Sequence, residues 1–341
     1  MRPQDAPERL ERRDLLKAAV GASLAGLAAA PAGLAAGSGA PALEPGGEGP
    51  VSKGRRIIDI HNHPCWLGKD ADAIVADMDR SGIERTWLLS WELPEHEMSP
   101  SYYRTLNPLG HGIPFRDVVH CRERHPGRFI AGYAPDPRDP HARARLRSAV
   151  EIHRVRVFGE LKVRALYDDP DLIAIFHDCA ELGLPVVFHL DVTLPRGAPQ
   201  NGRQYWYGGH IDNVERALKQ CPGTQFIGHA PGFWREISGD AESEPSAYPA
   251  GKPVKPGGRL IRLLERYPNL HCDLSAGSGY TALTRDLEFT RRFLIEHQDR
   301  CLFGRDQFDD RLHDLLMSLS LPEEALAKIL AGNALRLVPI S

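Results

Sequence analysis

The sequence predicts an α/β protein, a (β/α)8 TIM barrel. From residue 57 onward, eight short apolar or β-branched runs alternate with longer amphipathic segments. Glycine or proline falls between several of these segments and the run that follows. Repeated strand–helix alternation favours a parallel sheet that closes into a barrel. An open doubly wound sheet is the alternative, but no glycine-rich nucleotide loop follows the first run.

The elements follow from the apolar runs and the helix breakers, taken in chain order. The predicted strands are Ile57–His61, Thr86–Ser90, Phe129–Ala134, Val155–Val163, Pro185–Leu190, Gln225–His229, Leu270–Ser275 and Cys301–Asp306. The predicted helices include Asp70–Ser81, Pro170–Leu182, Ile211–Gln220, Arg259–Tyr267, Asp286–His297 and Pro322–Leu330. Gly82, Gly183, Pro222 and Pro268 lie just beyond helices, where a helix is expected to end.

The N-terminal residues do not resemble part of a barrel. Arg12-Arg13 precedes an Ala/Gly/Leu-rich stretch over residues 18–36, an order that is typical of a twin-arginine export signal. The alternative is a tail with a chance arginine pair. Pro31 interrupts the apolar stretch, which disfavours a permanent transmembrane helix.

We therefore predict a signal peptide over residues 1–36, a Gly/Pro-rich linker over 37–54 and a barrel domain over 55–341. The twin-arginine export machinery is then a partner, and the protein is expected outside the cytoplasm, in the periplasm or beyond. Membrane tethering by an uncleaved signal stays open, as does a homo-oligomer.

Composition excludes some classes of partner. The formal net charge is −3 at pH 7, so no nucleic-acid partner is expected. The six cysteines are scattered without CxxC spacing, and no disulfide framework is indicated. A small-molecule substrate is the expected partner.

Polar residues that can bind a metal end or follow the apolar runs. His61 and His63 end the first run, and alternate side chains of a strand share a face, so both can bind one ion. The further candidate ligands are Glu160, His189, His229 and Asp306. The carboxyl ends of barrel strands meet at one rim. Because buried charged groups are costly without partners, a shared cation would account for all six.

These residues resemble the amidohydrolase-related branch (amidohydrolase family 2) of the amidohydrolase superfamily. The matching motifs are His61-Asn62-His63, Gly159-Glu160-Leu161-Lys162, Phe188-His189, Gly228-His229-Ala230-Pro231, Phe303-Gly304-Arg305-Asp306 and Gly332-Asn333-Ala334-Leu335-Arg336. The resemblance covers nearly the whole chain after the signal. It implies a metal-dependent hydrolase and leaves the substrate open, since members hydrolyse amides, lactones or phosphoesters, and some hydrate or decarboxylate.

The resemblance also implies roles for individual residues. A single divalent metal, with zinc as the expected ion, would be bound by His61, His63, His189 and Asp306. His229 would polarise the substrate or move protons.

Glu160 introduces a two-metal alternative. In the TatD-like branch a carboxylate on the fourth strand bridges two metals, and the histidines of strands five and six hold the second. One metal is favoured over two. Lys162 shares a face with Glu160, and a carboxylated lysine would be another bridge. Arg305 stands where the family usually has Ser or Thr, a departure that changes the hydrogen bonds beside Asp306.

The expected chemistry is hydrolysis of an amide, lactone or related ester bond in a small substrate. A carboxylate on that substrate is expected from the loop arginines described below. Zinc lowers the pKa of bound water to roughly 7. Asp306 would accept the proton, and His229 would polarise the scissile carbonyl. The alternatives are a metal-dependent decarboxylase or hydratase of a small unsaturated acid, and an exported barrel that binds metal or ligand without turnover. The presence of Asp306 and His229 favours turnover, because binding alone needs no proton transfer.

Long loops after the strands are expected to shape the substrate site. They carry aromatic side chains, and arginines that can hold a carboxylate through two hydrogen bonds. The candidate substrate-binding residues are Arg203, Trp206, Trp234, Arg235 and Arg285. Ser275–Gly279 is interpreted as a glycine-rich loop. Surface or loop positions are expected for His111, His120, His125, His210 and His271.

Overall fold

The structure, a computed structural model, describes residues 54–93, 112–191, 207–244 and 246–340. All of these lie in one compact unit that spans Pro50–Ser341. The predicted signal peptide lies outside the described residues, as does all of the predicted linker except Gly54. His111, Arg203 and Trp206 also lie outside them.

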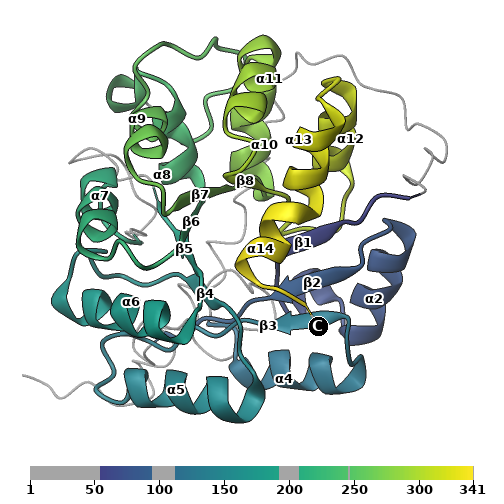
Figure 1. Cartoon of the computed structure of the whole chain (residues 1–341), viewed down its shortest axis with the longest axis vertical. Coiled ribbons are helices and arrows are strands. Elements are labelled where there is room, and N and C mark those ends of the chain that lie inside the picture. The colour runs from purple at the N-terminus through teal and green to yellow at the C-terminus, as the bar shows by residue number, and fades with distance from the viewer. Residues whose placement is uncertain (1–53, 94–111, 192–206, 245, 341) are drawn as a thin grey trace, which may run out of the picture. The chain divides into compact units, whose positions relative to one another are not determined.

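The strands form a parallel barrel, as the alternating pattern predicts. They are β1 (Ile58–Asn62), β2 (Arg85–Leu88), β3 (Phe129–Ala131), β4 (Phe158–Leu161), β5 (Val186–His189), β6 (Phe226–His229), β7 (Leu270–Asp273) and β8 (Cys301–Leu302). Ladders join β1-β2-β3 and β4-β5-β6-β7-β8 in parallel order. In Figure 1 the strands run around the middle of the unit, with the helices outside them.

Backbone hydrogen bonds bridge the two gaps between these ladders. Between β3 and β4, Arg156 N donates to Ala131 O and Tyr133 N donates to Val157 O, both at 3.0 Å. Between β8 and β1, Ile60 N donates to Phe303 O at 3.0 Å. The carboxyl ends of strands from both ladders therefore surround a common centre.

Helices cover the outside of the strands. The described helices are η1 (Trp66–Gly68), α2 (Ala71–Arg80), α4 (Phe115–Arg124), α5 (Ala142–His153), α6 (Pro170–Leu182), α7 (Ile211–Gln220), α8 (Pro231–Trp234), η4 (Arg235–Ile237), η5 (Ala241–Ser243), α9 (Arg259–Arg266), α10 (Ala276–Thr284), α11 (Leu287–Glu296), α12 (Arg311–Ser318), α13 (Glu323–Ala327), η6 (Lys328–Gly332) and α14 (Asn333–Leu337). Their apolar faces and the strands share one large core cluster. Within the described residues, no helix has the length and apolar character needed to cross a bilayer.

The ends of α6 show how local sequence sets the helix bounds. The Asp169 side chain accepts a hydrogen bond from Asp171 N, Pro170 occupies the first turn, and Gly183 ends the helix with φ 66°. A proline at the start and a left-handed glycine at the end are the residues that these positions favour. The predicted bounds of α6 are therefore those of the structure.

Two local predictions were wrong. Ser275–Gly279 is not a loop, because α10 begins at Ala276. Its glycine serves close packing: a Cβ on Gly279 would lie 2.3 Å from Leu274 O. His271 is not a surface residue either. It is buried in β7, where its Nε2 lies 2.9 Å from Gln225 Oε1.

Candidate metal centre

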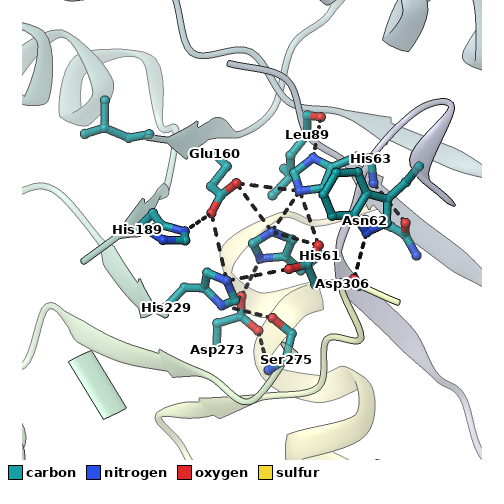
Figure 2. Close-up of polar contacts among 12 residues, drawn as sticks. His61, Asn62, His63, Leu89, Glu160, His189, His229, Asp273, Ser275 and Asp306 are labelled. Atoms are coloured by element: carbon teal, nitrogen blue, oxygen red, sulfur yellow. Dashed lines mark hydrogen bonds and ion pairs between the residues drawn. The ribbon is translucent and has the colours of Figure 1, made fainter. Parts of the chain in front are cut away.

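The strand ends bring the six predicted ligands together. His61, Glu160, His189 and His229 lie in β1, β4, β5 and β6, and His63 follows β1 directly. Asp306 follows β8 and is held by hydrogen bonds from its own N to His61 O, at 2.8 Å, and from Trp66 Nε1 to its carbonyl, at 2.9 Å. Figure 2 shows the six side chains pointing toward one another from these different elements.

The two carboxylate oxygens of Glu160 face two different pairs of imidazoles. Oε2 lies 3.6 Å from His63 Nε2 and 3.9 Å from His61 Nε2. On the other side, Oε1 lies 2.6 Å from His189 Nδ1 and 3.9 Å from His229 Nε2. Glu160 therefore stands between two nitrogen sets rather than beside one.

Asp306 closes the first of these sets. Its Oδ1 lies 3.4 Å from His63 Nε2 and 3.9 Å from His61 Nε2, and its Oδ2 lies 3.8 Å from His229 Nε2. Oδ1 is buried and has no hydrogen-bond partner. A buried carboxylate oxygen without a partner is costly. A cation between Asp306 and the two imidazoles would satisfy it, so these residues fit a metal ion.

The outer ring nitrogens are fixed by acceptors, which leaves Nε2 of three histidines facing the centre. His63 Nδ1 lies 2.9 Å from Leu89 O, and His61 Nδ1 lies 2.6 Å from Asp273 Oδ2. A carbonyl or carboxylate oxygen can only accept, so both Nδ1 atoms carry the proton. His229 Nδ1 lies 3.1 Å from Ser275 Oγ and 3.3 Å from Asp273 Oδ2. Such contacts orient metal-binding imidazoles.

The electrostatics of the centre favour a cation. Burial alone would lower the pKa of His61, but the charges of Asp306, Asp273 and Glu160 outweigh it and raise that pKa to about 10. Burial would raise the pKa of Glu160, yet the charges of His189 and Lys162 hold it well below its usual value. The carboxylates therefore stay ionised, and they create a negative field where the Nε2 atoms converge.

Among the described residues, three overlapping groups of ligand atoms are close enough together to hold an ion. They are His61, His63 and Glu160; His61, His229 and Asp306; and Glu160, His189 and His229. Imidazole and carboxylate donors suit zinc and similar divalent ions. Of the single-metal set expected from the sequence, His61, His63 and Asp306 lie together, whereas His189 lies beside the other oxygen of Glu160. The geometry thus offers a place for His189 and His229 around a second ion.

A cavity of about 450 Å³ opens at this centre. Its described lining residues are His63, Trp66, Trp91, Glu160, Lys162, His189, Asp191, Tyr207, His229, Ala230, Pro231, Tyr248, Ala276, Ser278 and Asp306. Its lining combines acidic and imidazole groups with the aromatic rings of Trp66, Trp91, Tyr207 and Tyr248. A small, partly apolar molecule would be accommodated there.

The described candidates for substrate binding lie elsewhere. Trp234 is buried and donates from Nε1 to Asp273 O at 3.0 Å. The guanidinium of Arg235 donates to Glu244 O at 2.8 Å, and that of Arg285 donates to Lys252 O at 2.7 Å. None of the three is among the described residues that line the cavity. Their donors are used to hold nearby backbone in place.

Asp273 is the main site residue that the sequence reasoning missed. It ends β7 as His229 ends β6. A polar residue at the end of an apolar run was the pattern that could have identified it. Its Oδ2 lies within 3.3 Å of Nδ1 on both His61 and His229. One carboxylate therefore orients imidazoles from β1 and β6.

Replacing Asp273 with asparagine is expected to weaken metal binding about 10- to 100-fold, because the amide loses the charge that orients both rings. A competition titration with a metal chelator measures this. Ser275→Ala removes only the hydroxyl beside His229 and should cost less. Wild-type affinity in Asp273→Asn would contradict the orienting role.

Comparisons with known proteins agree with the barrel fold. A family model described as amidohydrolase matches residues 58–340. A TIM-barrel protein of Bordetella bronchiseptica superposes with a TM-score of 0.56 and 17% identity, over 83% of this chain and 98% of that one. The 5-carboxyvanillate decarboxylase of Sphingomonas paucimobilis superposes with a TM-score of 0.53 and 16% identity, over 84% of this chain and 99% of that one. A probable 2-pyrone-4,6-dicarboxylic acid hydrolase of Acinetobacter baumannii superposes with a TM-score of 0.51 and 10% identity, over 83% of this chain and 98% of that one. At these identities the structural likeness shows the (β/α)8 barrel fold. No sequence among the curated proteins matches the chain.

Proposed function

Since the chain belongs to the amidohydrolase family, we propose that it is a metal-dependent hydrolase acting on a small, carboxylate-bearing substrate. The bond cleaved is an amide, lactone or related ester. The observation that carries this proposal is the position of Glu160 between two imidazole pairs, with the unpartnered Oδ1 of Asp306 beside one of them. Metal-assisted hydrolysis uses a cation site and a group that can accept a proton from water, and this cavity offers residues for both.

We further propose two divalent ions, with zinc as the expected metal. The first would be held by His61, His63 and Asp306 and by Oε2 of Glu160. The second would be held by His189 and His229 and by Oε1 of Glu160. The sequence favours one metal; the division of the Glu160 oxygens between two nitrogen sets favours two.

Bound divalent ions would polarise a carbonyl oxygen and lower the pKa of a water molecule. The protein's own contribution is to position the proton acceptor, the imidazoles and the substrate. Asp306 Oδ1, which has no hydrogen-bond partner and lies 3.4 Å from His63 Nε2, accepts the water's proton and returns it to the leaving group. Asp273 keeps His61 and His229 oriented throughout. The aromatic walls hold the substrate and exclude bulk water.

The metal content of purified protein tests the arrangement directly. The chain prepared without chelator is expected to hold two ions, and Glu160→Gln is expected to hold one or fewer, because an amide cannot bridge two cations. Elemental analysis per chain gives the count.

Glu236→Gln is the matched control, since Glu236 is buried but is not among the described residues lining the cavity. It should keep both ions. One ion in the wild type would favour the single-metal site with His229 as a catalytic group. No ion after metals are added back would contradict the proposed function.

Decarboxylation is the second candidate, because the same ligands and cavity can hold a carboxylate that departs as CO2. The alignment with 5-carboxyvanillate decarboxylase makes it worth separating experimentally. Hydrolysis of a lactone or ester releases a proton near neutral pH, whereas decarboxylation releases CO2 and incorporates one. Product analysis on matched lactones, esters and aromatic acids distinguishes the two reactions.

A further inference from the structure

Lys162 places a positive charge in the metal-binding cavity. It follows β4, two residues after Glu160, and it lines the cavity together with Glu160, His189 and Asp306. The ions proposed above do not use it as a ligand. Its role needs a separate explanation, because an ammonium group loses favourable hydration when it is drawn into a cavity.

Aromatic rings face Lys162 Nζ, and its charge also acts on the nearby carboxylate of Glu160. Nζ lies 5.0 Å from the centroid of the Trp91 ring and 5.7 Å from that of Tyr207. Among the described residues, none forms an ion pair with it or accepts a hydrogen bond from it. Lys252, by contrast, pairs with Glu244 at 2.7 Å. Ring faces attract an ammonium group, but they do not satisfy its three N–H donors.

The same two rings tie Lys162 to the metal centre. The Trp91 ring meets the His63 ring at 5.0 Å between centroids, with an interplanar angle of 77°. The Tyr207 ring meets the His189 ring at 5.7 Å and 83°. The ammonium group is therefore held at a set place relative to both proposed ion sites, with the cavity beside it.

We propose that Lys162 binds an anionic group of the substrate, a carboxylate, away from the bond that reacts. The ligand class is a small planar molecule with two polar ends: one end meets the ions, and a carboxylate at the other end accepts hydrogen bonds from Lys162 Nζ. The aromatic walls pack against the flat body between them. This inference rests on the proposed function, because it takes the ions as the site of reaction.

A carboxylated Lys162 acting as a metal bridge fits the geometry less well. The bridging position is already occupied by the carboxylate of Glu160, whose two oxygens face the two imidazole pairs. A carbamate would also remove the positive charge that the faces of Trp91 and Tyr207 attract.

The test compares two probes of nearly identical shape on metal-loaded protein: isophthalate, and 3-carbamoylbenzoate, in which one carboxylate is replaced by a neutral amide. Calorimetry gives the two dissociation constants. The wild type is expected to bind isophthalate about tenfold more tightly, the usual scale for a charged hydrogen bond. Lys162→Met should bind both probes equally, and Lys162→Arg should retain part of the preference. Lys69→Met is the control, since Lys69 lies 4.9 Å over the Phe308 ring but is not among the described cavity residues.

The metal content of each variant separates a failure of the proposed function from a failure of the role of Lys162. Wild-type protein that holds no metal overturns the proposed function. A metal-loaded Lys162→Met that still prefers isophthalate overturns the role of Lys162 alone. The same holds if the wild type shows no preference or binds neither probe. A third outcome is that Lys162→Met loses its metal, and that bicarbonate raises the metal content of the wild type but not of the variant. Lys162 would then be a carbamate ligand, which would also overturn its role in binding a carboxylate.

Discussion

Replacing Arg305 with methionine is expected to lower the free energy of unfolding by about 3–5 kcal/mol. The Arg305 side chain is almost fully buried and lies between two buried carboxylates. Its Nε donates to Asp59 Oδ2 at 3.0 Å and its Nη2 donates to Asp77 Oδ2 at 2.8 Å. Removing the cation leaves Asp59 buried without a counter-ion, and that is the costly step. Urea denaturation with chelator present measures the loss without a contribution from bound metal.

Arg80→Met is the matched control. Arg80 pairs with the same Asp77, but more than half of its side chain is exposed, so its loss should cost less than about 1 kcal/mol. If Arg305→Met proved as mild as the control, the buried triad of Arg305, Asp59 and Asp77 would not stabilise the barrel.

The triad also explains why an arginine occupies position 305, where the family usually has Ser or Thr. Asp59 Oδ1 accepts hydrogen bonds from His61 N, at 3.2 Å, and from Arg305 N, at 2.9 Å. It therefore joins the end of β1 to the residue before Asp306. Comparison with the family motif shows that Arg305 is a departure. It does not reveal the partners of Arg305, because they lie more than 200 residues away along the chain. Only the closed barrel brings β1, α2 and the end of β8 together.

Elements bounded by local signals were predictable from the sequence. The bounds of α6 and α7 agree with the prediction because caps and helix breakers mark their ends. Helix α10 was missed because Gly277 and Gly279 resemble loop residues. The need for a glycine at 279 comes from its approach to Leu274 O, a contact that no local pattern reveals.

The six rim residues were predictable because each one ends or follows an apolar run. Their division into two sets around Glu160 was not, since it depends on which oxygen faces which ring. The arginine predictions assumed that loop arginines contact substrate. Arg235 instead donates to a backbone carbonyl of its own loop, and Arg285 donates to backbone carbonyls of the segment between β6 and β7.

Replacing Asp306 with asparagine is expected to lower kcat by about 10²–10⁴-fold, the usual contribution of a positioned proton acceptor. The amide has nearly the same shape, and asparagine tolerates the φ of 51° at this position. The backbone contacts with His61 and Trp66 would remain. The fold should therefore persist while proton transfer fails. Steady-state kinetics on an identified substrate, corrected for the metal content of each preparation, measures the effect.

Asp309→Asn is the control, because Asp309 lies in the same loop, is partly exposed and pairs with Arg311. It should keep nearly full activity. Asp306→Asn with full metal and near-wild-type turnover would exclude Asp306 as the proton acceptor. Loss of turnover in proportion to lost metal would instead make Asp306 a ligand only. The hydrolytic proposal thus depends on a variant that keeps its ions and still fails to turn over.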